Sequence, residues 1–208
     1  MSDMKMLCEN RDVDFGGFVS TIRRKLVAHH ELYSMAPKAE YWEELLHRSL
    51  AEVGIDTDWK ADSNHGSGKD MTVVKSKWDN VGERISCKTG QIKDGKLCIS
   101  GSRLTKHKTL QEKVGFLADK KEDSYVLLSK EKDCDDNHYK LIMFPSSALD
   151  YENAQWSVVG HNKHGNPNYF GEGKGFFAKI QASMSDQLWT YIPDYENLPG
   201  LRTWDIEI

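Results

Sequence analysis

The 208-residue sequence lacks any long apolar run. Its longest uninterrupted apolar stretches, 125–128 and 141–144, span four residues each, whereas a helix that crosses a bilayer needs about 20. The N-terminal residues contain no apolar signal core, so we expect no secretion and no membrane partner, and a cytoplasmic location. With 38% hydrophobic and 29% charged residues, the chain has the composition of a soluble globular domain.

Cysteine is also scarce. The few cysteines are scattered along the chain, and none belongs to a Cys-x-x-Cys pair. They are too few for a disulfide framework in a chain of this size, and their spacing argues against a structural zinc site. We therefore expect free thiols in a reducing compartment at Cys8, Cys87, Cys98 and Cys134.

Positive charge is in deficit overall but is concentrated in one segment. The net charge of −4 argues against a wholly basic nucleic-acid binder. Residues 69–113, however, hold 11 Lys or Arg against 5 Asp or Glu, a net +6, which leaves −10 on the remainder. This asymmetry indicates a segment that could contact a polyanion. A solvated Lys-rich surface is the alternative interpretation.

The order of predicted elements indicates one domain. No internal repeat, low-complexity tract or linker-like change of composition interrupts residues 1–208. Apolar residues at helical spacing predict a helix over about 17–34 and another from Pro37 to Gly54, and Thr109 is expected to cap a third.

The strand signals complete the prediction of the fold. Predicted strands occupy 70–78, 83–92, 96–100, 124–129 and 139–144. The stretch 161–175, rich in Gly, Asn and His, is predicted to form a long hairpin or a loop excursion. Helices, a hairpin-rich region, a crossover helix and further strands predict an α/β (α+β) fold, with a central mixed β-sheet flanked by helices.

Polar residues at the start of this sheet form the most informative pattern. On the second predicted helix, Glu43 lies at the edge of the apolar face, while Glu44 points nearly opposite. Asp70 opens the first strand after a Gly-rich approach. Ser86 and Lys88 share one face of the next strand, and pairing of the two strands would place Asp70 beside them.

These residues resemble the PD-(D/E)xK nuclease superfamily, whose pattern is an acidic residue on a helix, an aspartate opening a strand, and (D/E)-x-K on the next strand. The resemblance runs from about Glu43 to Lys88, and helix–strand order extends it to about Leu128. It implies a restriction-endonuclease-like fold with a catalytic core over about 43–128. Residues 145–208 would then form an elaboration for recognition or dimerisation. The sequence departs from the pattern at Ser86, which replaces the second acidic residue, and at Lys69, where proline is frequent.

The resemblance also implies roles for these residues. Asp70 and Glu43 would ligate Mg²⁺, or Mn²⁺ in its place, with the backbone carbonyl of Cys87 as a third protein oxygen. Lys88 would orient or deprotonate the attacking water and stabilise the phosphate in the transition state. Ser86 could hold a water or a phosphate oxygen.

Two further segments are candidates for DNA contacts. Basic side chains suit phosphate oxygens, and Asn, His and Lys can read base edges. The His161-x-x-His164 pair lacks Cys or acidic partners at ligand spacing, which favours base reading over metal binding. Polar surface loops are the alternative for both segments. The candidates are Lys69, Arg103, Lys106, Lys108, His161, Asn162, Lys163, His164, Asn166 and Asn168.

The function we expect from this pattern is a type II restriction enzyme. It would be a Mg²⁺-dependent endonuclease that cuts double-stranded DNA at a short specific sequence, acting as a C₂ homodimer because the site is two-fold symmetric. A structure-specific repair or resolvase-like nuclease is one alternative. A non-catalytic DNA-binding protein on a degenerate nuclease fold is the other, and Ser86 keeps it open.

Overall fold

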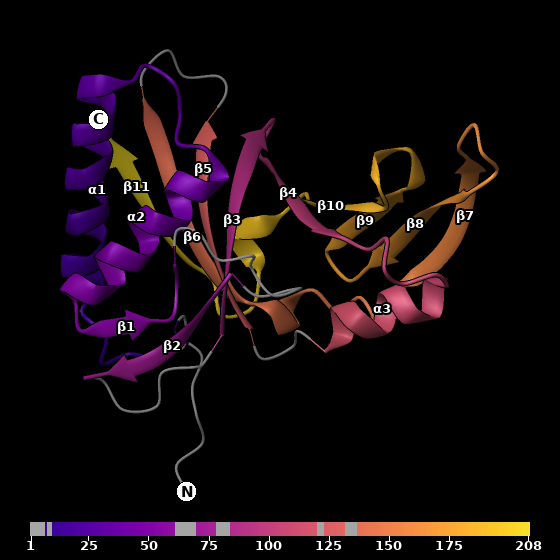
Figure 1. Ribbon diagram of the computed structural model, residues 1–208, viewed down its shortest axis with the longest axis horizontal. Helices are drawn as coiled ribbons and strands as arrows, with labels where there is room; N and C mark the ends of the chain where they lie inside the picture. The colour runs from indigo at the N-terminus through magenta and orange to yellow at the C-terminus, as the bar shows by residue number, and fades with distance from the viewer. Residues whose placement is uncertain (1–6, 8–9, 61–69, 78–83, 120–122, 132–136) are drawn as a thin grey trace, which may run out of the picture.

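The computed structural model describes residue 7 and residues 10–60, 70–77, 84–119, 123–131 and 137–208 (Figure 1). The described α-helices are α1 (Phe15–Leu32), α2 (Ala39–Glu52) and α3 (Leu110–Ala118). The described strands are β1 (Ile55–Thr57), β2 (Met71–Ser76), β3 (Arg84–Lys93), β4 (Lys96–Arg103), β5 (Asp123–Glu131), β6 (His138–Pro145), β7 (Gln155–His161), β8 (Pro167–Gly173), β9 (Phe176–Gln181), β10 (Gln187–Ile192) and β11 (Arg202–Glu207). Short 3₁₀ turns are η2 (Ser146–Ala148), η3 (Ala182–Met184) and η4 (Tyr195–Asn197).

Strand β3 is the branch point of the sheet. Its first residues pair antiparallel with β2, where Ile85 lies opposite Met71, and from Gly90 onward it pairs antiparallel with β4. Its other edge runs parallel to β5 over almost its whole length. The sheet order is β11-β6-β5-β3-β4-β10-β9-β8-β7, and β2 joins β3 outside this path. Residues 86–89 of β3 therefore lie in a fork between β2 and β4.

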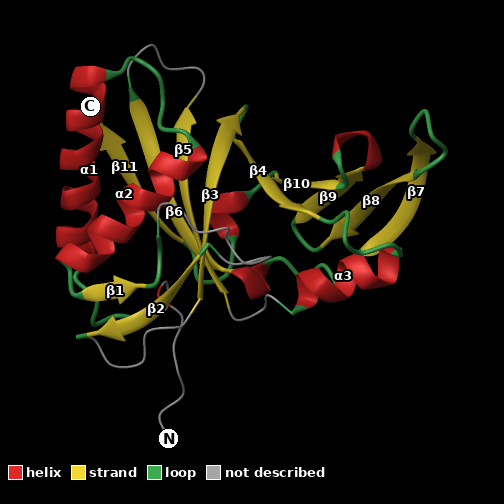
Figure 2. Ribbon diagram, viewed as in Figure 1, coloured by secondary structure: helices red, strands yellow, loops and turns green. Residues whose placement is uncertain are grey.

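The sheet separates two apolar cores because its central strands are apolar on both faces. In β5, Val126 and Leu128 pack in the first core, and Tyr125 and Leu127 pack in the second. Helices α1 and α2 cover the first core at one end of the sheet, whereas α3 lies beside β7 to β10 at the other end and contributes Leu117 to the second core (Figures 1 and 2). The four-residue apolar runs of the sequence are thus strands buried on both faces.

The helices begin and end close to where local signals predict. Helix α1 starts two residues earlier than predicted, because the Asp14 carboxylate accepts a hydrogen bond from Gly17 N at 2.9 Å and caps the first turn. Helix α2 ends just before Gly54, whose φ of +86° suits glycine. Thr109 caps α3 in a capping box with Glu112. No described helix is long and apolar enough to cross a membrane.

The predicted class, helices around a large mixed sheet, is confirmed, and the predicted strands appear as β2 to β6. β4 continues beyond its predicted end at Ser100 as far as Arg103. The predicted strand boundaries at Trp78 and Glu83, with the turn between them, lie outside the described residues.

Of the two alternatives predicted for 161–175, a long hairpin or a loop excursion, the structure has antiparallel strands, and the central part is a further strand that the sequence did not predict. That part is strand β8, which pairs with β7 on one side and with β9 on the other. Its glycines were interpreted as loop signals, but they permit close packing inside a strand. A Cβ on Gly171 would lie 2.8 Å from the Trp156 ring, and one on Gly173 would lie 2.2 Å from the Phe176 ring.

Two buried tyrosines predict a loss of stability at high pH. Burial raises the pKa of Tyr139 and of Tyr151 to about 12. In the unfolded chain both phenols ionise near pH 10. The stability contributed by the neutral phenols is therefore complete below about pH 10 and is lost as the pH rises to about 12, by about 2 to 3 kcal/mol per tyrosine.

Urea unfolding at a series of pH values above 9 checks this expectation, with Tyr151→Phe as the comparison. The Tyr151 hydroxyl and Thr190 Oγ1 share a hydrogen bond of 2.8 Å, so the variant should be less stable at neutral pH. Its free energy of unfolding should nevertheless fall less steeply with pH than that of the wild type. Equal slopes would contradict the assignment.

Candidate active site

The fork of β3 brings three of the predicted catalytic residues into contact. Lys88 Nζ lies 2.6 Å from Asp70 Oδ2, and Ser86 Oγ donates a hydrogen bond to the same oxygen at 3.4 Å. The side chains of Lys88 and Asp70 are 15% and 18% exposed, so the ion pair is shielded but open to solvent. The contact predicted from strand alternation is present.

Local packing explains why these side chains converge. Ile85 and Cys87 belong to the first core, which fixes the orientation of β3. Because side chains alternate along a strand, Ser86 and Lys88 then share the opposite face. Asp70 immediately precedes β2, whose first residue pairs with Ile85, so its carboxylate lies next to Ser86.

Helix α2 contributes Glu43 and not Glu44 to this region. Glu43 Oε2 accepts a hydrogen bond from Trp59 Nε1 at 3.4 Å, and Trp59 packs against the first core. Glu44 instead pairs with Arg48 one turn later, at 2.7 Å, on the outer surface of the helix. Glu43 thus approaches β3 from the helical side of the sheet.

Cys87 lies within electrostatic range of Asp70, Lys88 and Glu43. Burial is the main cause that raises the pKa of the Cys87 thiol well above its ordinary value, and the negative charges of Asp70 and Glu43 raise it further. The positive charge of Lys88 acts in the opposite direction. Burial therefore favours the neutral thiol of Cys87 over the thiolate.

The donor set near the fork suits a hard cation better than a transition metal. Asp70 supplies a carboxylate at the fork and Glu43 supplies one from the helical side of the sheet, while β3 offers backbone carbonyls between them. Within the described parts of the chain, no cluster of three His, Cys, Asp or Glu side chains could hold a metal ion. Two carboxylates are nevertheless sufficient for Mg²⁺, which usually keeps several waters. With Lys88 the three side chains carry a net charge of −1, which would attract a cation.

The predicted phosphate contacts lie on the segment from the end of β4 to α3. Arg103, Lys106 and Lys108 are exposed, and Lys108 Nζ donates to the Thr105 carbonyl at 3.2 Å. Lys69 lies outside the described residues. Not every cation of the basic segment is available to a polyanion, because Lys88 is held in the ion pair at the fork.

A buried ion pair holds the β4–α3 segment in place. Lys113 Nζ lies 3.1 Å from Asp186 Oδ2 and also donates to the backbone carbonyls of Leu104 and His107. Its side chain is 4% exposed, so all three ammonium hydrogens find acceptors inside the protein. This lysine fixes the loop and does not contact solvent.

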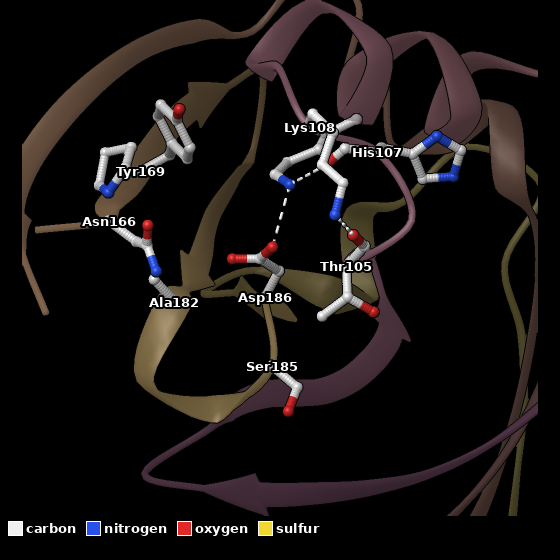
Figure 3. A pocket seen from close by; sticks show the side chains of 10 residues that line it. Thr105, His107, Lys108, Asn166, Tyr169, Ala182, Ser185 and Asp186 are labelled. Carbon is white, nitrogen blue, oxygen red and sulfur yellow. Dashed lines mark hydrogen bonds and ion pairs between the residues drawn. The ribbon is translucent and has the colours of Figure 1, made fainter. Parts of the chain in front are cut away.

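A pocket of about 280 Å³ lies between the two segments predicted to bind DNA (Figure 3). Lys108 lines it from the β4–α3 segment, and Asn166 and Tyr169 line it from β8 and the turn before it. Ser185 and Asp186 close a third side. Segments about 60 residues apart in the sequence are thus neighbours, which the sequence alone did not predict.

The predicted base-reading residues divide into exposed and structural ones. His161, Lys163, His164 and Asn166 are exposed around the β7–β8 turn. Two asparagines have internal roles that reduce their availability to DNA. Asn162 Oδ1 accepts hydrogen bonds from the backbone N–H groups of His164 and Asn166, at 2.9 and 3.0 Å. Asn168 Oδ1 accepts one from Ala182 N at 2.9 Å.

Sequence reasoning missed Lys113, Asp186 and Trp59. Lys113 had a visible signal, because it lies between Leu110 and Leu117 on the apolar face of a helix, where a charged residue needs a buried partner. No signal in the sequence identified that partner, because Asp186 is 73 residues away. Trp59 likewise meets Glu43 only through the tertiary fold.

Comparisons of the chain with protein-family models, with curated proteins and with solved structures find no match. Function must therefore be inferred from two groups of side chains. One is the cluster at the fork of β3, and the other is the set around the pocket between the β4–α3 segment and β8.

Cys87 should be unreactive in the folded protein. Its thiol is buried and its pKa is raised, so at pH 8 it should resist alkylation by iodoacetamide, whereas the partly exposed Cys98 should react. Peptide mass mapping after labelling, with and without urea, measures this difference. Rapid labelling of Cys87 without urea would show that the fork is open to solvent and would contradict the burial of this strand.

Proposed function

We propose that this protein is a metal-dependent DNA endonuclease with a restriction-endonuclease-like fold, of the PD-(D/E)xK superfamily. The observation that carries the proposal is the 2.6 Å contact between Lys88 and Asp70 on neighbouring strands. Ser86 lies beside them, and Glu43 approaches from α2. Within this class we propose a type II restriction enzyme of double-stranded DNA, acting in the cytoplasm as a homodimer in which each protomer cuts one strand.

The chain's own residues have separable roles in this chemistry. Asp70 and Glu43 would hold the Mg²⁺ or Mn²⁺ ion together with the Cys87 carbonyl. Lys88 donates hydrogen bonds to the attacking water or to the phosphate and stabilises the charge that develops on it. Ser86 orients Asp70 through its hydroxyl. When bound, the metal would supply Lewis-acid activation of the phosphate and a water of lowered pKa.

The surroundings of the pocket support a DNA substrate. Exposed basic residues of the β4–α3 segment and exposed polar residues of the β7–β8 turn face the same region, and Lys108 and Asn166 line one cavity. Basic side chains can fix the position of the backbone, while Asn and His can read base edges. The Lys113–Asp186 ion pair stiffens this region, which favours specific recognition.

A second candidate function is DNA binding without cleavage. Ser86 replaces an acidic residue of the pattern, and in the described residues no third His, Cys, Asp or Glu completes a metal cluster with Asp70 and Glu43. These observations favour a degenerate site. A repair or resolvase-like nuclease remains the alternative if cutting requires branched or single-stranded DNA.

The central test is incubation of a long defined duplex with and without Mg²⁺ or Mn²⁺, followed by gel electrophoresis. Discrete metal-dependent fragments are expected. Asp70→Ala, Lys88→Ala and Glu43→Ala should each lower the cleavage rate at least about 100-fold, because each removes charge from the reacting centre. Glu44→Ala is the matched control on the same helix and should cut normally.

Near-normal cutting by Asp70→Ala or Lys88→Ala would refute the site. If the folded wild type cuts no DNA with either metal, non-catalytic binding is the correct function. Ser86→Asp then shows whether Ser86 is the cause, because cleavage gained by this variant would mean that the serine inactivates the site. A smear of products, or cutting of branched DNA alone, would establish the repair or resolvase-like function.

Duplex binding should depend steeply on salt. Removing the side chain that binds one phosphate lowers the slope of log K against log salt by about 0.9 for duplex DNA. Lys106→Ala and Arg103→Ala should therefore each lower the slope by about one, as measured by fluorescence anisotropy without metal. Lys75→Ala, which changes an exposed residue of β2, is the control. A flat salt dependence of the wild type would contradict phosphate binding by this segment.

A further inference from the structure

Strands β8, β9 and β10 expose an unusual face. Their inward side chains, which include Ala178, Ile180 and Leu188, belong to the second core. The outward side chains lie on the side of the sheet that α1 and α2 cover, but these helices pack at the far end, against β3 and β11 (Figure 1). The outward side of β8 to β10 therefore carries mostly half-buried or exposed side chains, with Gln187 as a buried exception.

Four aromatic residues and one lysine occupy this outward side, and we name them the aromatic face. They are Phe170, Phe177, Lys179, Trp189 and Tyr191. Each of the four rings is half-buried, and Lys179 is exposed. Apolar rings on an outward sheet face are not required by the core, which the inward residues already fill.

Strand register arranges these side chains in two rows. Phe170, Lys179 and Trp189 lie side by side across β8, β9 and β10. Phe177 and Tyr191 form the next row. Neighbouring strands are about 4.8 Å apart, so the rings form a compact lattice. The rings of Phe170 and Phe177 are 5.9 Å apart, and Lys179 Nζ lies 5.3 Å from the centre of the Tyr191 ring.

A cleft continues from the aromatic face toward the α1–α2 connection. Its volume is about 520 Å³, within the range of small-ligand sites. Trp189 forms one wall and Pro37 another, while Gln91, Ser100 and Lys130 supply polar groups. The buried indole N–H of Trp189 has no hydrogen-bond partner among the described residues, so packing alone holds this ring at the edge of the cleft.

The charge around the aromatic face favours an anion. Lys179 lies within it, Lys130 lines the adjoining cleft, and strand register places Lys93 and Lys96 on the same side at the β3–β4 hairpin. Glu172, which pairs with Phe177, is the acidic residue on this side of β8. Four ammonium groups against two carboxylates, those of Glu172 and of Asp94 in the hairpin turn, leave a positive excess that favours a polyanion over an acidic or neutral partner.

We propose that the aromatic face binds single-stranded DNA by stacking unpaired bases. Aromatic rings accept any base and lysines attract the backbone, whereas the bases of a duplex are already stacked on one another. The choice of DNA over RNA rests on the proposed function, but the stacking surface does not. This surface is separate from the Asp70–Lys88 pair, which lies on the other face of the sheet. Its presence gives the nuclease a means to hold an unpaired strand.

The test is fluorescence anisotropy with a labelled oligothymidylate of about 16 nucleotides, in EDTA. Trp189→Ala and Tyr191→Ala should each weaken binding roughly tenfold or more, because a stacked base contributes about 1 to 3 kcal/mol. Trp204→Ala, a partly buried tryptophan on β11 at the opposite edge of the sheet, is the matched control and should bind normally. Circular dichroism checks that each variant is folded.

Lys179→Ala provides a test that removes no ring. It changes an exposed residue and should lower the salt slope of binding by about 0.7, the value for one phosphate of a single strand. Unchanged affinity in the ring variants, or no binding by the wild type, would overturn the proposal. Tighter binding of oligouridylate would overturn the choice of DNA. A dimer that dissociates on Trp189→Ala would assign the face to self-association instead.

The same measurements separate this proposal from the proposed function. Asp70→Ala should bind oligothymidylate as the wild type does, although it is expected to lose cleavage. If the wild type binds the oligonucleotide through the aromatic face but cuts no DNA with Mg²⁺ or Mn²⁺, the nuclease proposal fails and the binding face stands. The converse result, cutting without single-strand binding, refutes the aromatic face alone.

Discussion

The change of partner along one edge of β3 is the constraint on which the candidate site depends. The other edge of β3 pairs with β5 over almost its whole length. This pairing fixes the position of β3 where its first edge changes partner from β2 to β4. Cys87, buried on the helical side, prevents rotation of the strand. The fork therefore presents polar groups at a fixed place in a rigid sheet.

The sheet also divides the molecule into two parts with different properties. Where α1 and α2 cover it, both faces are buried, and a charged pair can be held close with little freedom. Where β7 to β10 extend beyond these helices, one face packs around α3 and the other carries half-exposed rings. Within the second part, the ion pair of Lys113 and Asp186 links α3 to the residues just before β10. The proposed catalytic residues lie in the first part, and the residues proposed to bind DNA lie in the second.

Much of the fold could be predicted because its signals are local. Thr109 predicts the start of α3, which it caps together with Glu112, and Gly54 predicts the end of α2. The apolar runs of β5 and β6 predict buried strands. The sequence left a hairpin and a loop excursion open for 161–175 and did not predict β8 as a separate strand, because glycine occurs both in loops and at closely packed positions of strands. In a loop it supplies conformational freedom, but at Gly171 it makes space for a tryptophan ring from β7. A loop glycine and a strand glycine can therefore be distinguished only when the neighbouring tryptophan is known.

The sequence by itself determined the pairing of Asp70 with Lys88, because strand alternation and one hairpin suffice to bring them together. It also determined the helical position of Glu43. Only the tertiary structure decided that Lys113 meets Asp186, that Lys108 and Asn166 line one pocket, and that rings from three strands share one face. These contacts join distant segments through the order of strands in the sheet, and that order depends on the packing of the whole chain and not on any local pattern.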